Sequence, residues 1–276
     1  MEILSKIKGL KIHEIPDLEG WIGDAKFGIN QLSPYFYNKN KFEVLEVGCG
    51  IGILLASLKE KFPNLSVEGI EPYLGGFGRL EIAKNIIAKN IKINYLKFES
   101  FQPKKKYDII YSVNVFEHLK NWELYLKKTK EWLKPQGISI ILCPNYSFPY
   151  ESHFKIPIIL NKKITYVFFK NKIDKFEKDK KALGLWESLN FIKMRDIKNY
   201  CFNNELRFKY CEKVFNDIIN RLDVDKEFKK RQSFVGLCAK NLQRLGFIKL
   251  FNNRIFHSFH PYMKIEIAQK QSNENN

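Results

Sequence analysis

The chain has 276 residues, is 45% hydrophobic and 28% charged, and carries a formal net charge of +17. This composition excludes an intrinsically disordered protein, and the lack of an uncharged run near about 18 residues excludes a transmembrane segment. The five cysteines are scattered and form no CxxC pair, which predicts reduced thiols in a cytoplasmic protein and argues against disulfides or a zinc site.

The excess of positive charge is compatible with a phosphate-rich partner. Only seven of the 47 basic residues are arginine, and lysine is the weaker bidentate ligand for phosphates and bases. The charge therefore favours a solvated lysine surface. A small-molecule partner that is acidic or phosphorylated stays open, and nucleic acid is possible but not favoured.

After an N-terminal segment, 1–41, that is expected to be partly helical, strand and helix patterns alternate as far as residue 145. The expected strands are 42–48, 65–72, 91–100, the start of 107–119, and 138–145. The expected helices are 53–62, 79–90 and 123–137. Strands that alternate with helices of about 10–15 residues predict right-handed βαβ units and a doubly wound, mostly parallel sheet.

The alternation stops after Asn145. Residues 146–232 contain lysine-rich helical patterns and are expected to form a helical insertion above the carboxyl edge of the sheet, where it would cap an acceptor substrate. A helix is expected at 234–246, followed by two final strands at 247–251 and 262–270. The main domain would then comprise residues 42–145 and 233–270.

Residues 46–52, EVGCGIG, join the first strand to the first helix and contain glycine at every second position. Such a turn brings backbone N–H groups and a helix N-terminus close to a ligand. A dinucleotide-binding turn would need glycine or alanine at position 53, which is isoleucine, and no lysine follows as in a phosphate-binding loop. Glu71, at the end of the second strand, is placed to accept both hydroxyls of a ribose.

In combination these features resemble the class I S-adenosylmethionine-dependent methyltransferases. LEVGCGIG (45–52) is similar to their glycine motif and GIEP (69–72) to their ribose-binding acid. YDIIYSVNVFEHL (107–119) and WLKPQGISIILCPN (132–145) are similar to their fourth and fifth strands. The resemblance implies a Rossmann-like, seven-stranded sheet with its last strand antiparallel, and S-adenosylmethionine as the cofactor.

The resemblance also implies a cofactor site. Its residues would be Glu46, Gly48, Cys49, Gly50, Gly52, Glu71, Pro72, Glu99, Ser100 and Asn114. The glycines would hold the methionine portion with Glu46 near its amino group, Glu71 and Pro72 the ribose, and Glu99 and Ser100 the adenine, while Asn114 would border the sulfur. Two simpler interpretations stay open: Glu46 could cap the turn, and Glu99 could be a surface acid.

Candidates for acceptor chemistry lie in PNYSFPYESHF (144–154). Methyl transfer needs acceptor, methyl and sulfur held in line, and a hydroxyl acceptor also needs a base. His153 is the first candidate because a free imidazole has a pKa near about 6.5, and Glu151 and Tyr146 are the alternatives. This loop could instead only pack the insertion onto the sheet, and His118 is expected to be a structural or cofactor-shell histidine and not a base. No metal site is expected.

The sequence thus predicts a methyltransferase that acts on a small molecule at oxygen, such as a sugar or glycan precursor. Two alternatives stay open. An RNA or other nucleic-acid methyltransferase is suggested by the charge alone. A non-catalytic protein that keeps the fold would have no need for the intact glycine loop and Glu71.

Overall fold

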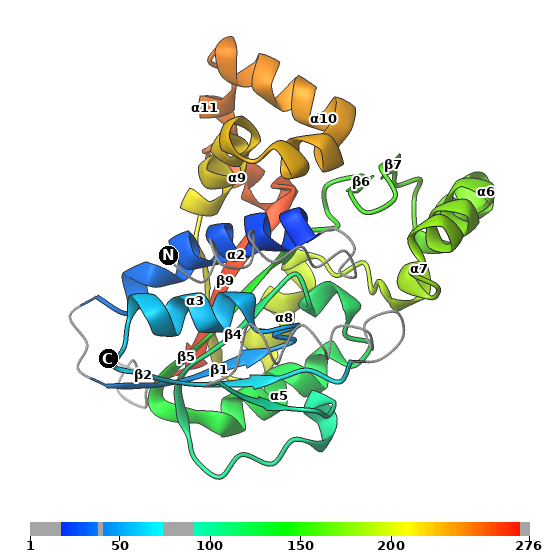
Figure 1. Ribbon diagram of the computed structural model, residues 1–276. Coiled ribbons are helices and arrows are strands. Elements are labelled where there is room, and N and C mark those ends of the chain that lie inside the picture. The colour runs from blue at the N-terminus through cyan, green and yellow to red at the C-terminus, as the bar shows by residue number, and fades with distance from the viewer. Residues whose placement is uncertain (1–17, 38–40, 74–90, 271–276) are drawn as a thin grey trace.

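The computed structural model describes residues 18–37, 41–73 and 91–270, and the helix expected at 79–90 lies outside them. Its centre is a seven-stranded sheet in the order β3-β2-β1-β4-β5-β9-β8 (Figure 1). The strands are β1 (Phe42–Val47), β2 (Leu65–Ile70), β3 (Lys92–Asn94), β4 (Tyr107–Val113), β5 (Leu133–Pro144), β8 (Leu206–Tyr210) and β9 (Tyr262–Gln269). Only β9 runs antiparallel to its neighbours, so the predicted Rossmann-like, mostly parallel sheet is confirmed.

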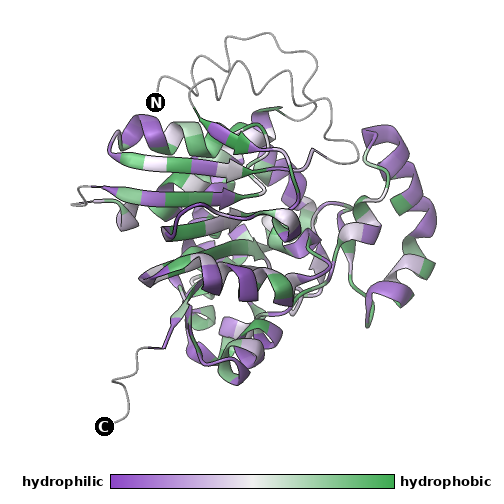
Figure 2. Ribbon diagram, turned by 90° about the horizontal axis from the view of Figure 1, so that it is seen from below, coloured by the Kyte–Doolittle hydropathy of each residue, from purple (hydrophilic) through white to green (hydrophobic). Residues whose placement is uncertain are grey.

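Helices cover both faces of the sheet, and the central strands are buried on both sides. On β1, Val44 packs in the core under α2 (Leu18–Leu32) and α3 (Ile53–Lys61). Its neighbour Leu45 packs in the core under α5 (Trp122–Trp132) and α8 (Met194–Asn203). Because successive strand residues point to opposite faces, a strand buried on both faces is mostly apolar, and the hydrophobic residues of the central strands allowed their prediction (Figure 2).

The strand order reverses between β1 and β4. β1 pairs in parallel with β2 on one side and with β4 on the other. The loops that leave β1 and β4 therefore lead to helices on opposite faces, and in folds of this kind ligands bind at the carboxyl edge where the strand order reverses.

The last two strands differ from the prediction. The segment 247–251, expected to be a strand, contains the short helix α11 (Ile248–Phe251). The strand that completes the sheet is β8, which lies inside the segment 146–232 that was expected to be a helical insertion. β8 pairs only with β9 at the edge, and its exposed Arg207 and Lys209 interrupt any apolar run, so its sequence carries little strand signal.

A smaller insertion remains after β5. Residues 146–191 contain β6 (Tyr150–Glu151), β7 (Ile156–Pro157), α6 (Lys162–Lys180) and α7 (Leu185–Ser188). They have a hydrophobic core of their own around Phe154 and Trp186. Figure 1 shows α6 and α7 beside the main body, on the side where the central strands end. The insertion in the structure, residues 146–191, is therefore about half as long as the predicted insertion, residues 146–232. The reason is that α8, β8 and α9 (Lys213–Val224) belong to the main domain.

The C-terminal helices complete the face that carries α2. α10 (Lys226–Arg244) contains a break at Ser233, whose φ is 49°. None of the helices in the described ranges is long and apolar enough to cross a membrane.

The cysteines at positions 49, 143, 201, 211 and 238 form no disulfide bonds.

Arg221 on α9 ties these helices together, and its loss should be costly. The side chain is 6% exposed, donates to Asp24 at 2.7 Å and to Asp225 at 2.8 Å, and lies over the Phe228 ring at 4.3 Å. Arg221→Ala is expected to lower the free energy of unfolding by about 2–4 kcal/mol, because Asp24 and Asp225 both lose their ion pair with Arg221. Asp24 keeps its second ion pair, with Arg231. Urea titration measures this loss. Arg244→Ala, at an exposed position on α10, should change stability little, and an equal loss there would contradict the prediction.

Candidate functional site

The glycine loop after β1 is built from backbone alone. Gly48, Gly50 and Gly52 have φ values of +75°, +52° and +80°, which side chains disfavour. A Cβ added at Gly48 would lie 2.4 Å from the Val115 side chain, and one at Gly50 would lie 3.1 Å from the Trp21 ring. The loop is therefore packed from both sides, and Gly52 directly precedes α3. Only glycine fits this cradle.

Glu71 lies against this loop. Its Oε2 accepts a hydrogen bond from the Gly50 N–H at 2.9 Å, and its Oε1 accepts one from the Tyr73 N–H at 3.1 Å. The Tyr73 hydroxyl donates back to the Gly50 carbonyl at 2.7 Å. Burial raises the pKa of Glu71, although the carboxylate stays partly exposed, as does the adjacent Pro72. Each carboxylate oxygen keeps a lone pair, so the side chain fits the predicted ribose hydroxyls.

Glu46 lies beneath the loop, at the end of β1. It is 4% exposed and accepts a hydrogen bond from the Tyr111 hydroxyl at 3.0 Å. Burial, together with the nearby Glu71 carboxylate, raises the pKa of Glu46 to about 8. A buried carboxyl of this kind fits a cationic amino group, which would favour its ionised form.

Cys49 lies within the loop, and its Sγ donates to the Gly50 carbonyl at 3.8 Å. The side chain is buried and points toward β2, since a Cβ added at Gly69 would lie 2.5 Å from the Cys49 Sγ. Glu99 and Ser100 lie in the short helix η3 (Phe98–Ser100), which follows β3. Their predicted contact with adenine stays a prediction.

Asn114 follows β4 in a left-handed conformation, with φ of 54°. Its Oδ1 accepts a hydrogen bond from the hydroxyl of Tyr262 on β9 at 2.8 Å, and its N–H donates to the Leu142 carbonyl at 2.8 Å. Tyr262 was not predicted from the sequence, because nothing in its local pattern links it to a loop 148 residues earlier. Trp21 and Tyr73 were missed as well, although Trp21 stands in an aromatic segment that precedes the first strand.

The three predicted acceptor-site residues come together in the insertion. Glu151 Oε1 lies 2.6 Å from His153 Nδ1 and accepts a longer hydrogen bond, 3.4 Å, from the Tyr146 hydroxyl. Burial opposes ionisation of Glu151, but the neighbouring imidazole overcomes it, so the pKa of Glu151 is lowered and that of His153 is raised. Tyr146 and Glu151 are buried, whereas the His153 side chain is 28% exposed. Of the three, His153 is the one that an acceptor can reach.

Two further residues, from the helix η4 (Phe116–His118) after β4, face this group. The His118 and His153 rings are 5.5 Å apart, and His118 Nδ1 lies 2.8 Å from the Ser188 hydroxyl. Burial, with a contribution from His153, lowers the pKa of His118 to about 3. Burial likewise raises the pKa of Glu117 to about 7. Glu117 was not among the predicted site residues. The signal that could have identified it is its position next to His118 in the fourth-strand motif.

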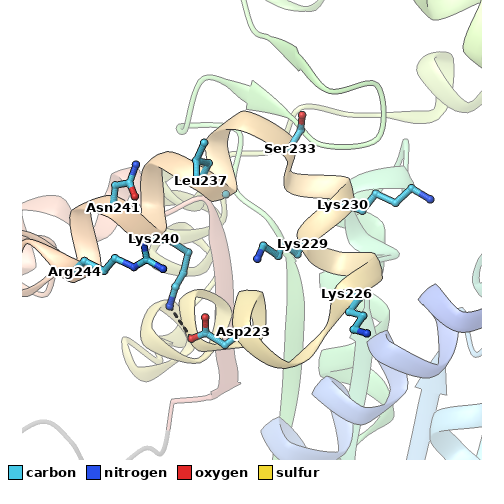
Figure 3. Close-up of a pocket in the computed structure, with 10 residues that line it drawn as sticks. Asp223, Lys226, Lys229, Lys230, Ser233, Leu237, Lys240, Asn241 and Arg244 are labelled. Carbon is cyan, nitrogen blue, oxygen red and sulfur yellow. Dashed lines mark hydrogen bonds and ion pairs between the residues drawn. The ribbon is translucent and has the colours of Figure 1, made fainter.

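A cavity of about 370 Å³ lies elsewhere, between α9 and α10 (Figure 3). It is lined by Lys226, Lys229, Lys230, Lys240 and Arg244 among others. Lys240 is paired with Asp223 at 2.7 Å. None of the predicted cofactor or acceptor residues lines this cavity, so the basic charge of α10 gathers outside the candidate site.

The sequence matches the family described as "Methyltransferase domain" over residues 23–191, more than half of the chain. The chain belongs to this methyltransferase family. The matched range contains the glycine loop, Glu71, Asn114, His118 and His153. Together with the sheet topology, the family confirms the prediction of a class I S-adenosylmethionine-dependent methyltransferase and of its cofactor.

Several relatives share the sequence or the fold. An uncharacterised protein of Mycobacterium tuberculosis is 32% identical over 197 residues, 69% of this chain, and the match spans 66% of that relative. A ubiquinone biosynthesis O-methyltransferase of Rickettsia typhi is 26% identical over 78% of this chain and 96% of its own length. Phosphoethanolamine N-methyltransferase 2 of Haemonchus contortus, solved with S-adenosyl-L-methionine, shares the fold with a TM-score of 0.51 at 16% identity, over 89% of this chain and 53% of that protein.

Proposed function

We propose that the protein transfers a methyl group from S-adenosylmethionine to an oxygen atom of a small-molecule acceptor. The observation that carries the proposal is the imidazole and carboxylate cluster of Glu117, His118, Glu151 and His153, part of which follows Asn114 by three residues in the chain. A hydroxyl acceptor must lose a proton, and groups of this kind handle that proton. The Rickettsia typhi relative, which the match covers almost completely, is named an O-methyltransferase.

The chain's residues would divide the work as follows. Bound S-adenosylmethionine supplies a methyl group on a positively charged sulfur. The glycine loop, Glu46 and Glu71 hold and orient it, and Asn114, fixed by Tyr262, lies at the end of β4 toward the acceptor. In the transfer the S–CH3 and acceptor O–H bonds would break and a new O–CH3 bond would form, so that S-adenosylhomocysteine and one proton leave. His153 can take that proton at Nε2, because Glu151 engages its Nδ1.

The insertion, residues 146–191, is the proposed cap over the acceptor. It supplies Glu151 and His153 from one end and Ser188 from the other, and the Asn190 side chain fixes it to the carbonyls of Phe116 and Leu119 at 2.8 and 3.0 Å. A cap that is held at both ends can exclude water from the transfer.

Incubation of the purified chain with methyl-labelled S-adenosylmethionine and fractionated cell extract tests the proposal. Label should enter a small-molecule fraction and resist mild base, as an aryl or alkyl ether does and an ester does not. Calorimetry should show binding of S-adenosylmethionine to the same preparation. Label that enters RNA, with binding that weakens steeply as salt rises, would favour the nucleic-acid alternative instead.

Binding of S-adenosylmethionine should release a proton near pH 7. Glu46, with a pKa of about 8 in the free protein, is mostly protonated at pH 7, and a cationic amino group beside it would ionise it. Tyr111 and Glu71 also face this carboxyl, and neither changes the sign: Tyr111 stays neutral, and Glu71 only raises the pKa of Glu46. Calorimetry in buffers of different ionisation enthalpy measures the release. Glu46→Gln should abolish it, and a release that persists in this variant would contradict the assignment.

A further inference from the structure

The Glu117 carboxyl group is buried without a partner. It is 0% exposed, and within the described part of the chain neither Oε1 nor Oε2 has a hydrogen-bond partner. Leaving a buried polar group unsatisfied costs about 1–3 kcal/mol, and more for a charged one. Its nearest titratable neighbour, His118 Nε2, lies 4.0 Å from Oε1, too far for a hydrogen bond. The structure therefore holds two carboxylate oxygens that are suited to a ligand.

Both histidines of the cluster are fixed through their Nδ1 atoms. His118 Nδ1 contacts the Ser188 hydroxyl, and His153 Nδ1 contacts the Glu151 carboxylate. Histidines that bind metals are commonly held in this way, with one nitrogen on a carboxylate or another polar group and the other on the ion. The arrangement leaves the two Nε2 atoms available for coordination.

The three side chains are close enough to share one ion. One possible ligand atom from each of Glu117, His118 and His153 lies within 4.8 Å of the others. Bonds of about 2.0–2.2 Å from a metal to nitrogen and oxygen set ligand atoms about 3–4 Å apart, so small side-chain rotations would close the site. Besides His153, the charges that act on Glu117 come mainly from the carboxylates of Glu151 and Asp24. These negative charges favour the binding of a cation between the three side chains.

We propose that Glu117, His118 and His153 bind one divalent first-row transition-metal cation. Two imidazoles and one carboxylate suit zinc, manganese or iron(II) and leave further coordination positions open. One of these would take the acceptor oxygen; this role rests on the proposed function, whereas metal binding does not. A bound hydroxyl loses its proton more readily, so the cation would promote loss of the proton to solvent in place of transfer to His153, and His153 would serve as a ligand.

Titration of the EDTA-treated full chain with cobalt(II) tests the site, because cobalt in such a site absorbs visible light. One equivalent per chain is expected to bind, and zinc should displace it. Glu117→Gln, His118→Asn and His153→Asn should each abolish binding, and Ser188→Ala should weaken it about tenfold through the orientation of His118. His257→Asn, which alters a histidine of the helix η5 (Arg254–Phe259), is the matched control and should bind cobalt like the wild type.

Two further measurements make each result decisive. Glu117→Gln removes a buried charge without changing shape, so its melting temperature in EDTA should equal or exceed that of the wild type, which shows that lost binding is not misfolding. The affinity for S-adenosylmethionine should be unchanged in every variant. Absence of stoichiometric cobalt, zinc and manganese binding to the wild type, or binding that survives all three ligand substitutions, would overturn the proposal. Cobalt binding without methyl transfer would instead refute only the proposed function.

Discussion

Gly50→Val is expected to reduce the affinity for S-adenosylmethionine by more than about 100-fold. Valine at φ of +52° is a conformational outlier, and its Cβ would meet the Trp21 ring at 3.1 Å. The strained loop would move the Gly50 N–H away from Glu71, which removes the hydrogen bond that positions the carboxylate predicted to bind the ribose. Isothermal titration calorimetry with S-adenosylmethionine, alongside a thermal melt of each variant, measures the effect.

Gly184→Val is the control for backbone strain. Gly184 has a φ of +84°, and a Cβ added there would have no atom within 4 Å. It therefore carries a similar conformational cost in the insertion without a clash. Equal loss of cofactor affinity in both variants, or a folded Gly50→Val protein that binds within tenfold of the wild type, would refute the assigned loop. A scaffold that does not need the cofactor would keep its partner binding in Gly50→Val.

Replacement of His153 by asparagine is expected to lower the rate of methyl transfer by about 100- to 10,000-fold. The asparagine amide can still donate to the buried Glu151, as Nδ1 does now, but it has no counterpart to Nε2. Both the metal-free proton transfer and the metal-bound route require that nitrogen. The measurement is the initial rate at which label from S-adenosylmethionine enters the extract fraction that the wild type methylates.

The affinity of His153→Asn for S-adenosylmethionine should match that of the wild type, because the predicted cofactor residues lie in other loops. His257→Asn should keep the wild-type rate, since His257 lies in η5 and contacts Glu212. A rate within threefold of the wild type in His153→Asn would mean that the loop only packs the insertion onto the sheet, the alternative that the sequence left open.

The cofactor half of the site could be predicted because its signals are local. The three glycines stand at every second position within five residues, and their positive φ values, with the close contacts around Gly48 and Gly50, favour glycine there. Glu46 and Glu71 each end a buried strand, and the parallel pairing of β1 and β2 brings those two ends together. Sequence spacing is enough to place such residues at one edge.

The acceptor half could be predicted only in part. His153, Glu151 and Tyr146 lie within eight consecutive residues, and the structure does bring them into one cluster. Glu117, His118 and Ser188 join that cluster from other segments, 35 to 36 residues away from His153. No local periodicity encodes which side chains of an insertion meet a loop of the main domain, so the metal-binding arrangement was not visible in the sequence.

The sequence predicted the doubly wound sheet and the glycine loop, because buried parallel strands are mostly apolar and a tight ligand-binding turn favours residues without side chains, and its resemblance to a known family implied the cofactor. The tertiary structure alone decided that β8 rather than 247–251 completes the sheet, because a short edge strand with one partner needs little apolar pattern. It also decided that Tyr262 holds Asn114 and that the Glu117 carboxyl group, which has no hydrogen-bond partner among the described residues, lies near two histidines. Those contacts join segments that are distant in the chain, and only folding brings them within reach of one another.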